Sequence, residues 1–268
     1  MRLSNNGLGL GPICSVAAAV FCFSGAAALA QPATGAQPLS GPGSLHGVWI
    51  SARFGVRDGE GGPSGRTPGP PLTAEGKPVP LMPWAEKLMM ERIKDADEGH
   101  PHASPKSRCL PAGTPGSMLP PASLPLQIIE SSDQITVLFE EFNQFRIIRM
   151  NEKHADEPEP GYFGNSVGHW EGDTLVVDTI GLNDQTTIGN DMPHTDALHV
   201  VERIRRNGDE LEIQSTFEDP KTFTSAWSSK GKLKKVPGIR LAEYFCENDR
   251  NTPDEKGRSG VQLTSTGK

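Results

Sequence analysis

The chain has 268 residues and carries 26 Lys and Arg against 33 Asp and Glu, so its formal net charge is −7. An acidic chain without a dense run of basic residues argues against nucleic acid and anionic membranes as partners. The sequence has no Walker loop, no dinucleotide fingerprint and no G-x-S-x-G elbow. Nucleotide cofactors and serine-hydrolase chemistry are therefore poor expectations, and we expect no cofactor.

Residues 1–30 have the pattern of a secretory signal. Arg2 precedes an apolar run from Ile13 to Leu29, and the small residues Ala28-Leu29-Ala30 precede Gln31. Polar residues interrupt the run and no stop-transfer pattern follows, which argues against a membrane span. We predict cleavage near Ala30, a periplasmic or secreted protein, and no membrane insertion after cleavage.

Two cysteines remain after the predicted signal, Cys109 and Cys246. In an oxidising compartment, two cysteines without C-x-x-C spacing favour a single disulfide. A free nucleophilic thiol is the less favoured alternative, because the residues around Cys109 read as a loop and Cys246 ends a strand-like run.

The chain after the signal predicts a single domain over residues 45–248. Flexible segments are expected at 31–44 and 249–268, where apolar residues are scarce. The Gly- and Pro-rich stretch 59–80 predicts a long surface loop, and loops of that length are often functional, for example as lids. Residues 83–99 predict a helix, with a proline at its start, apolar residues four apart and a glycine at its end.

Beyond Pro125 the apolar period changes to two, which predicts β-strands. Three strands are expected in 126–151, one hairpin in 166–182 with its turn at 171–173, and another in 197–219 with its turn at 207–209. Two weaker strands are expected at 222–228 and 239–247, and one more at 44–51. These make a mainly β protein of about eight to ten antiparallel strands, and such an up-and-down meander usually closes into a barrel.

Two resemblances agree with a barrel. Residues 47–49, GVW, resemble the Gly-x-Trp opening signature of lipocalins and other calycins, which implies a basic residue stacked on Trp49, for which Arg240 is the expected candidate. The stretches CLPAGTPGSM, GNSVGHWEGDTLVVDT, ALHVVERIRR and EDPKTFTSAW resemble a widespread family of uncharacterised secreted bacterial proteins. That resemblance covers much of 45–248 and implies export and a lipocalin-like barrel, but no chemistry. The chain is longer than a typical lipocalin, which leaves the role of residues 59–125 open.

Asp178 is the first candidate site residue. On the predicted strand it shares a face with Val176 and Ile180, and a carboxylate on an apolar face must be paired, hydrogen-bonded or shifted in pKa. If this face points into the barrel, Asp178 is a candidate base. If it points outward, Asp178 is an ordinary solvated residue. Glu171 and Asp173 are most simply turn residues.

Two histidines form the second candidate group. The strand that follows His194 places His199 and Arg203 on one side and Glu202 on the other, so His199 and Glu202 cannot bind the same metal. A site with His194, His199 and a carboxylate would be of the two-His-one-carboxylate kind, but no H-E-x-x-H motif supports it, and we expect no metal. The alternative is that both histidines only hydrogen-bond a loop.

Arg146 and Arg149 fall on opposite faces of one predicted strand, as Glu140 and Glu141 do at the end of another. One of each pair is expected in the interior, more often as a structural ion pair than as a catalytic one. Trp49, Trp170 and Trp227 either line a pocket or are core residues.

Two functions fit these residues, and the sequence does not decide whether the protein is an enzyme. The first is binding of a small apolar or aromatic molecule in the barrel. Its ligand-binding candidates are Trp49, Trp170, Trp227, Arg146, Arg203 and Glu202. The second is a cofactor-free isomerase, lyase or hydratase that uses His199, Asp178 and His194 for acid–base chemistry. A structural module would be favoured by a barrel interior that is solidly packed.

Overall fold

The structure is a computed structural model, and it describes residues 43–51, 71–98, 109–118, 124–186, 188–189 and 192–245. These residues belong to one compact unit, Ala36–Lys268. Several predictions concern residues outside these ranges: the signal 1–30, the tail 249–268, Cys246, and most of the segments 31–44 and 59–80.

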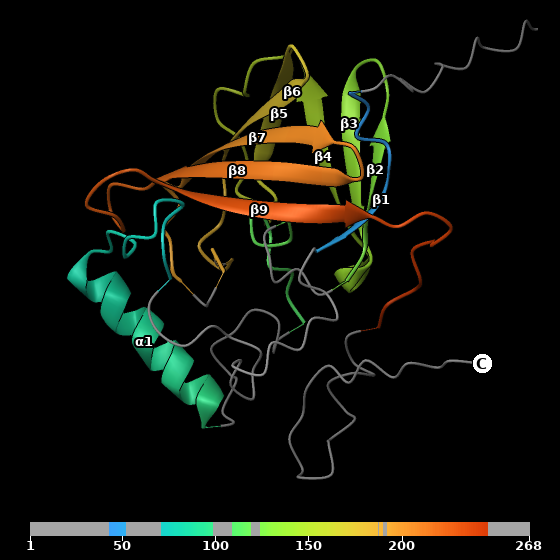
Figure 1. Cartoon of the computed structure of the whole chain (residues 1–268). Coiled ribbons are helices and arrows are strands. Elements are labelled where there is room, and N and C mark those ends of the chain that lie inside the picture. Colours follow the sequence, from blue (N-terminus) through green and yellow to red (C-terminus); the bar gives the residue numbers. More distant parts are fainter. Residues whose placement is uncertain are drawn as a thin grey trace, which may run out of the picture. The chain divides into compact units, whose positions relative to one another are not determined.

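Nine strands form a closed barrel in chain order (Figure 1). The prediction of a mainly β protein with a barrel is therefore confirmed. The strands are β1 (Gly47–Ser51), β2 (Leu126–Glu130), β3 (Gln134–Phe139), β4 (Gln144–Met150), β5 (Asn165–Glu171), β6 (Thr174–Ile180), β7 (His199–Asn207), β8 (Glu210–Glu218) and β9 (Trp227–Lys235).

One strand pair runs against the prediction of a purely antiparallel meander. β4 and β5 are parallel, with Ile148 opposite Ser166 and Met150 opposite Gly168, whereas every other neighbouring pair is antiparallel. β5 can run parallel to β4 only if the chain first returns to the end of the barrel at which β4 begins. Residues 151–164 make that return, and their turn-rich composition gave no sign of it.

The predicted hairpins are confirmed, and their turns have a local cause. Gly172 and Gly208 adopt φ of 63° and 62°, a left-handed conformation that glycine takes at little cost. The strands expected at 222–228 and 239–247 are wrong. The chain instead forms β9 at Trp227–Lys235, and residues 239–245 lie in no strand.

The predicted helix is α1, Pro83–Asp97, which ends two residues before the expected Gly99. Its Met89 is fully buried in an apolar cluster with Phe217 and Trp227, so the helix packs against the barrel through this side chain. Ahead of it, residues 71–80 do not form an open loop, because Leu72 bridges to Pro78 and Val79 is buried. Within the described part of the chain, no helix is long and apolar enough to cross a membrane.

Candidate functional site

The barrel interior contains a layer of polar side chains between two apolar clusters. On β8, Ile213 belongs to one cluster and Phe217 to the other, and Ser215 lies between them. On β7, Glu202 lies in the same way between Ile204 and Val200. We call this set the polar layer, and it consists of Arg146, Ser166, Thr179, Glu202, Ser215 and Ser229.

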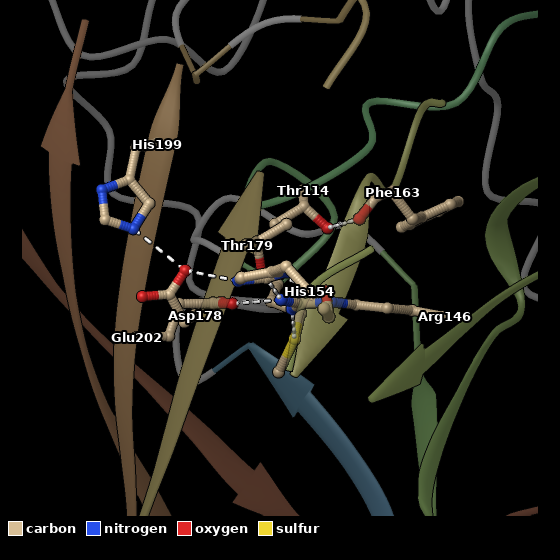
Figure 2. A network of polar contacts seen from close by, with 10 residues as sticks. Thr114, Arg146, His154, Phe163, Asp178, Thr179, His199 and Glu202 are labelled. Atoms are coloured by element: carbon tan, nitrogen blue, oxygen red, sulfur yellow. Dashed lines mark hydrogen bonds and ion pairs between the residues drawn. The ribbon is translucent and has the colours of Figure 1, made fainter. Parts of the chain in front are cut away.

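An ion pair between Arg146 and Glu202 forms the centre of the polar layer. Both side chains are buried, with 1% and 0% of their area exposed, and Nη2 of Arg146 lies 2.5 Å from Oε2 of Glu202. Arg146 also donates to the hydroxyls of Thr179 and Ser166, at 2.9 Å and 3.1 Å, and to the Met118 sulfur at 3.4 Å. Figure 2 shows the two charged groups pointing toward one another. The expected interior Arg–Glu pair thus exists, but its acid is Glu202, and Glu140 and Glu141 take no part in it.

Among the residues that the structure describes, three oxygen atoms of the polar layer have no hydrogen-bond partner. They are Oε1 of Glu202 and the hydroxyl oxygens of Ser215 and Ser229, all buried. Glu202 lies opposite Ser215 across the β7–β8 pair, and Ser215 lies opposite Ser229 across the β8–β9 pair. The unpaired atoms therefore come from one row across three adjacent strands. Buried polar groups without a partner are rare and call for an explanation.

Aromatic side chains lie next to this row, on the side of α1. The ring centroids of Phe217 and Trp227 are 4.3 Å apart, and those of Phe223 and Trp227 are 5.5 Å apart in an edge arrangement. The indole Nε1 of Trp227 is buried and has no acceptor. Trp227 thus brings an unused donor to the inward position of β9 next to Ser229.

Asp178 faces outward, which decides the alternative that the sequence left open. Its side chain is 40% exposed, and its Oδ1 lies 2.8 Å from Nε2 of His154 and 3.0 Å from Nε2 of His199. His154 also contacts Oδ1 of Asn165 through Nδ1, at 2.7 Å. Two imidazoles from distant segments therefore converge on one carboxylate oxygen on the outer face of β6 (Figure 2).

His194 lies apart from that cluster and is fully engaged. Its Nδ1 donates to the carbonyl oxygen of Thr195 at 2.9 Å, so the neutral ring accepts the Thr186 hydroxyl at Nε2, at 2.5 Å. Burial lowers the pKa of His194, which keeps the ring neutral. It holds loops together and does not meet His199.

The buried neutral state of His194 predicts a pH dependence of stability. Because its pKa in the folded protein lies below the ordinary value of 6.5, the unfolded chain binds the proton more readily. Its contribution is complete above about pH 6.5 and is lost as the pH falls through the lower folded-state pKa. Urea unfolding should give a free energy of unfolding that decreases as the pH is lowered from 7 to 5. In a His194→Gln variant this decrease should be smaller. A slope that persists in His194→Gln and vanishes in the exposed His169→Gln variant would contradict this assignment.

The remaining candidates occupy different places. Arg203 lies on the outer face of β7 and pairs with Glu171 at 2.6 Å, away from the interior. Trp170 is partly buried against the core and lines a surface depression of about 80 Å³ together with Glu130 and Met150. A depression of that size is well below the range of about 300–1,000 Å³ typical of small-molecule sites.

Trp49 is a core residue, fully buried, and its indole nitrogen donates to the carbonyl of Leu45 at 2.8 Å. The basic residues over its ring are Arg206 at 6.0 Å and Lys235 at 5.5 Å. Arg240 is exposed and is not one of them, so the expectation of Arg240 is wrong. Cations from later strands do lie over the Trp49 ring, but they come from β7 and β9.

Cys109 is disulfide-bonded in the structure. Cys246 lies outside the described residues, so the pairing of these two cysteines remains a prediction. In the described part of the chain, no group of three or more His, Cys, Asp and Glu side chains is arranged to hold a metal ion.

Five residues received no role from the sequence: His154, Ser166, Thr179, Ser215 and Ser229. Ser215 carried a signal, because it takes an inward position in an alternating strand where an apolar residue is expected. Ser229 carried none, since apolar residues do not alternate along its strand. His154 carried no signal in the sequence, since it lies in the irregular connection between β4 and β5.

The fold and the interior define a closed nine-stranded barrel with a buried polar layer. No protein-family model and no curated protein matches the sequence. Among solved structures, the chain is similar to a secretary abundant heat soluble (SAHS) protein from Ramazzottius varieornatus, at 14% identity and a TM-score of 0.28, over 42% of this chain and 70% of that one.

It is also similar to the fluorescent protein UnaG, at 16% identity and a TM-score of 0.27, over 42% of this chain and 72% of that one. A point mutant of UnaG gives 15% identity, a TM-score of 0.26, and coverage of 42% of this chain and 70% of that one. Likenesses of this size assign neither a fold family nor a function. The resemblance to secreted bacterial proteins stays a prediction.

Proposed function

We propose that this protein binds a small molecule inside its barrel, at the polar layer. The observation that supports the proposal is the row of unpaired oxygens of Glu202, Ser215 and Ser229 on three adjacent strands. An unsatisfied buried polar group costs about 1–3 kcal/mol, so three together would burden a purely structural core. A bound molecule that pairs with them removes that cost.

The buried ion pair supports the same proposal. Replacing a buried ion pair by well-packed apolar residues is often neutral or stabilising, so Arg146 and Glu202 are a poor choice for stability alone. In a binding site, by contrast, the ion pair holds Glu202 in place and leaves its second carboxylate oxygen for a ligand. Trp227 and Phe217 supply the apolar wall of such a site.

Export forms part of this proposal. The signal pattern of residues 1–30 supports a periplasmic or secreted location, where the disulfide expected for Cys109 would be stable. The N-terminal sequence of the protein recovered from a periplasmic fraction tests this, and a mature chain that begins near Gln31 is the expected result.

Native mass spectrometry tests the binding proposal. The protein purified from its own host should carry an additional small mass under native conditions, which denaturing conditions release. A Ser215→Ala/Ser229→Ala variant should carry less of this additional mass. The Ser228→Ala variant, which is altered on the outer face of β9, should carry as much as the wild type. If the wild-type protein carries no additional mass and no compound in a metabolite library raises its Tm, the proposal is wrong.

A second candidate function rests on the outer cluster of His154, Asp178 and His199. A carboxylate held by two imidazoles is an arrangement suited to proton transfer, as the cofactor-free enzyme hypothesis requires. The groups are a fifth to two fifths exposed, and exposure weakens the electrostatic control that such catalysis needs. We therefore rank it below ligand binding.

Depletion of compounds from a metabolite library tests the second candidate. The wild-type protein should consume a compound that Asp178→Asn does not, and the His169→Gln variant, which alters an exposed histidine elsewhere, should behave as the wild type. If the wild type depletes nothing, or if Asp178→Asn is fully active, the outer cluster is not a catalytic site.

A further inference from the structure

We propose that the polar layer selects an electrically neutral molecule with at least two N–H or O–H donors on an aromatic or apolar body. This inference rests on the proposed function and names the chemical class of its ligand. Three features of the layer support it: its charge balance, the kinds of atoms left unpaired and the side chains beside them.

The charges of the layer already balance. The guanidinium of Arg146 and the carboxylate of Glu202 are in contact at 2.5 Å, and both are buried. A ligand with its own charge would therefore enter an apolar interior without a free counterion, and burial of an unpaired charge is strongly unfavourable. A neutral ligand avoids this penalty.

The unpaired atoms call for donors. Oε1 of an ionised Glu202 can only accept a hydrogen bond, whereas the hydroxyls of Ser215 and Ser229 can both accept and donate. Four of the five N–H groups of Arg146 already engage Ser166, Thr179, Met118 and the other oxygen of Glu202, so the one that is left cannot serve all three oxygens. The ligand must therefore bring one donor for Glu202 and a second polar hydrogen for the serine pair.

The row also sets the width of the polar group. Neighbouring strands lie about 4.8 Å apart, so atoms on β7, β8 and β9 span about two strand spacings before the side chains lean inward. The two N–H groups of a primary amide share one nitrogen and reach acceptors about one strand spacing apart, so a primary amide pairs with two neighbouring atoms of the row, and a urea or a pair of ring hydroxyls reaches further. A single alcohol would leave at least one oxygen unpaired.

The aromatic side chains accommodate the rest of the molecule. Phe217 and Trp227 lie one inward-facing position further along β8 and β9 from the two serines, and the free indole N–H of Trp227 calls for an acceptor. On the other side of Ser229, the inward position of β9 is Gly231, which brings no side chain into the interior. A flat molecule with a carbonyl or ether oxygen near its donors matches this environment.

Four probes of similar size test the inference: benzamide, benzylammonium, benzoate and ethylbenzene. We expect benzamide to bind and to shift the indole N–H signal of Trp227 in NMR spectra, which a Trp227→Phe variant identifies. Each of the other three should bind at least about tenfold more weakly, because one lost hydrogen bond or one unpaired buried charge corresponds to a factor of this size.

Variants locate the effect. Ser215→Ala/Ser229→Ala should weaken benzamide about tenfold and leave the affinity for ethylbenzene unchanged, and Ser228→Ala should alter neither. Ethylbenzene or benzoate binding as tightly as benzamide would overturn the inference while the proposed function stands. So would a charged molecule released from the native protein. If no probe shifts Trp227, the inference also fails, and if the native protein is empty as well, the proposed function fails with it.

Discussion

Replacing Arg146 by methionine is expected to lower the free energy of unfolding by about 3–5 kcal/mol, because it leaves the buried Glu202 carboxylate without its counterion. The variant also removes the hydrogen bonds from Arg146 to Ser166 and Thr179. Urea unfolding monitored by tryptophan fluorescence measures the change. The control is Arg203→Met, which breaks an exposed pair with Glu171 and should change the free energy of unfolding little, because solvent screens such a pair.

A double variant separates the charge from the packing. If the unpaired carboxylate causes the loss, Arg146→Met/Glu202→Leu should recover a large part of it, since two apolar residues replace both charges. A double variant as unstable as Arg146→Met alone would mean that the packing of the arginine, and not its charge, holds the interior together.

Trp49→Ala is the second change with a large expected effect, about 3–5 kcal/mol. The side chain is fully buried in the core cluster with Leu126 and Leu233, and its removal leaves a cavity. It also frees the Leu45 carbonyl, which accepts the indole N–H. Thermal unfolding should show a much lower Tm, whereas Trp84→Ala, at a 43% exposed position on α1, should change it little. Equal losses in the two variants would contradict the assignment of Trp49 to the core.

Much of the barrel was predictable because alternation of apolar and polar residues survives wherever one face of a strand is buried. β7 and β8 show it clearly, and their shared turn is marked by Gly208. β9 escaped prediction because its inward positions include Ser229 and Gly231 and its outward ones are mostly lysines, so alternation of apolar residues is lost. The parallel β4–β5 pair escaped because a crossover between parallel strands is usually a helix, and residues 151–164, which make this crossover, contain none.

The site was predictable in part. Strand periodicity predicted that either Arg146 or Arg149 points inward and that Glu202 shares a face with Val200 and Ile204, but it did not decide which arginine is buried. Their pairing joins β4 to β7, and periodicity gives no neighbours across a barrel. Asp178 could not be placed inside or outside, because its face also carries Val176 and Ile180. The structure resolves this by showing that His154 and His199 reach it on the outer face.

The short parallel pairing of β4 with β5 has a consequence for local opening. Only Ile148, Arg149 and Met150 of β4 are paired with β5, whereas β7 and β8 are paired along nine positions. Amide hydrogens on either side of this junction should therefore exchange with solvent through a low-energy opening, well before those of β7 and β8. Arg146 crosses the same junction through its side chain, from β4 to Ser166 on β5 and Glu202 on β7. The side chain of Arg146 thus spans the barrel where its backbone ladder is short, and the rate at which this junction opens would set how quickly the proposed ligand enters and leaves the interior.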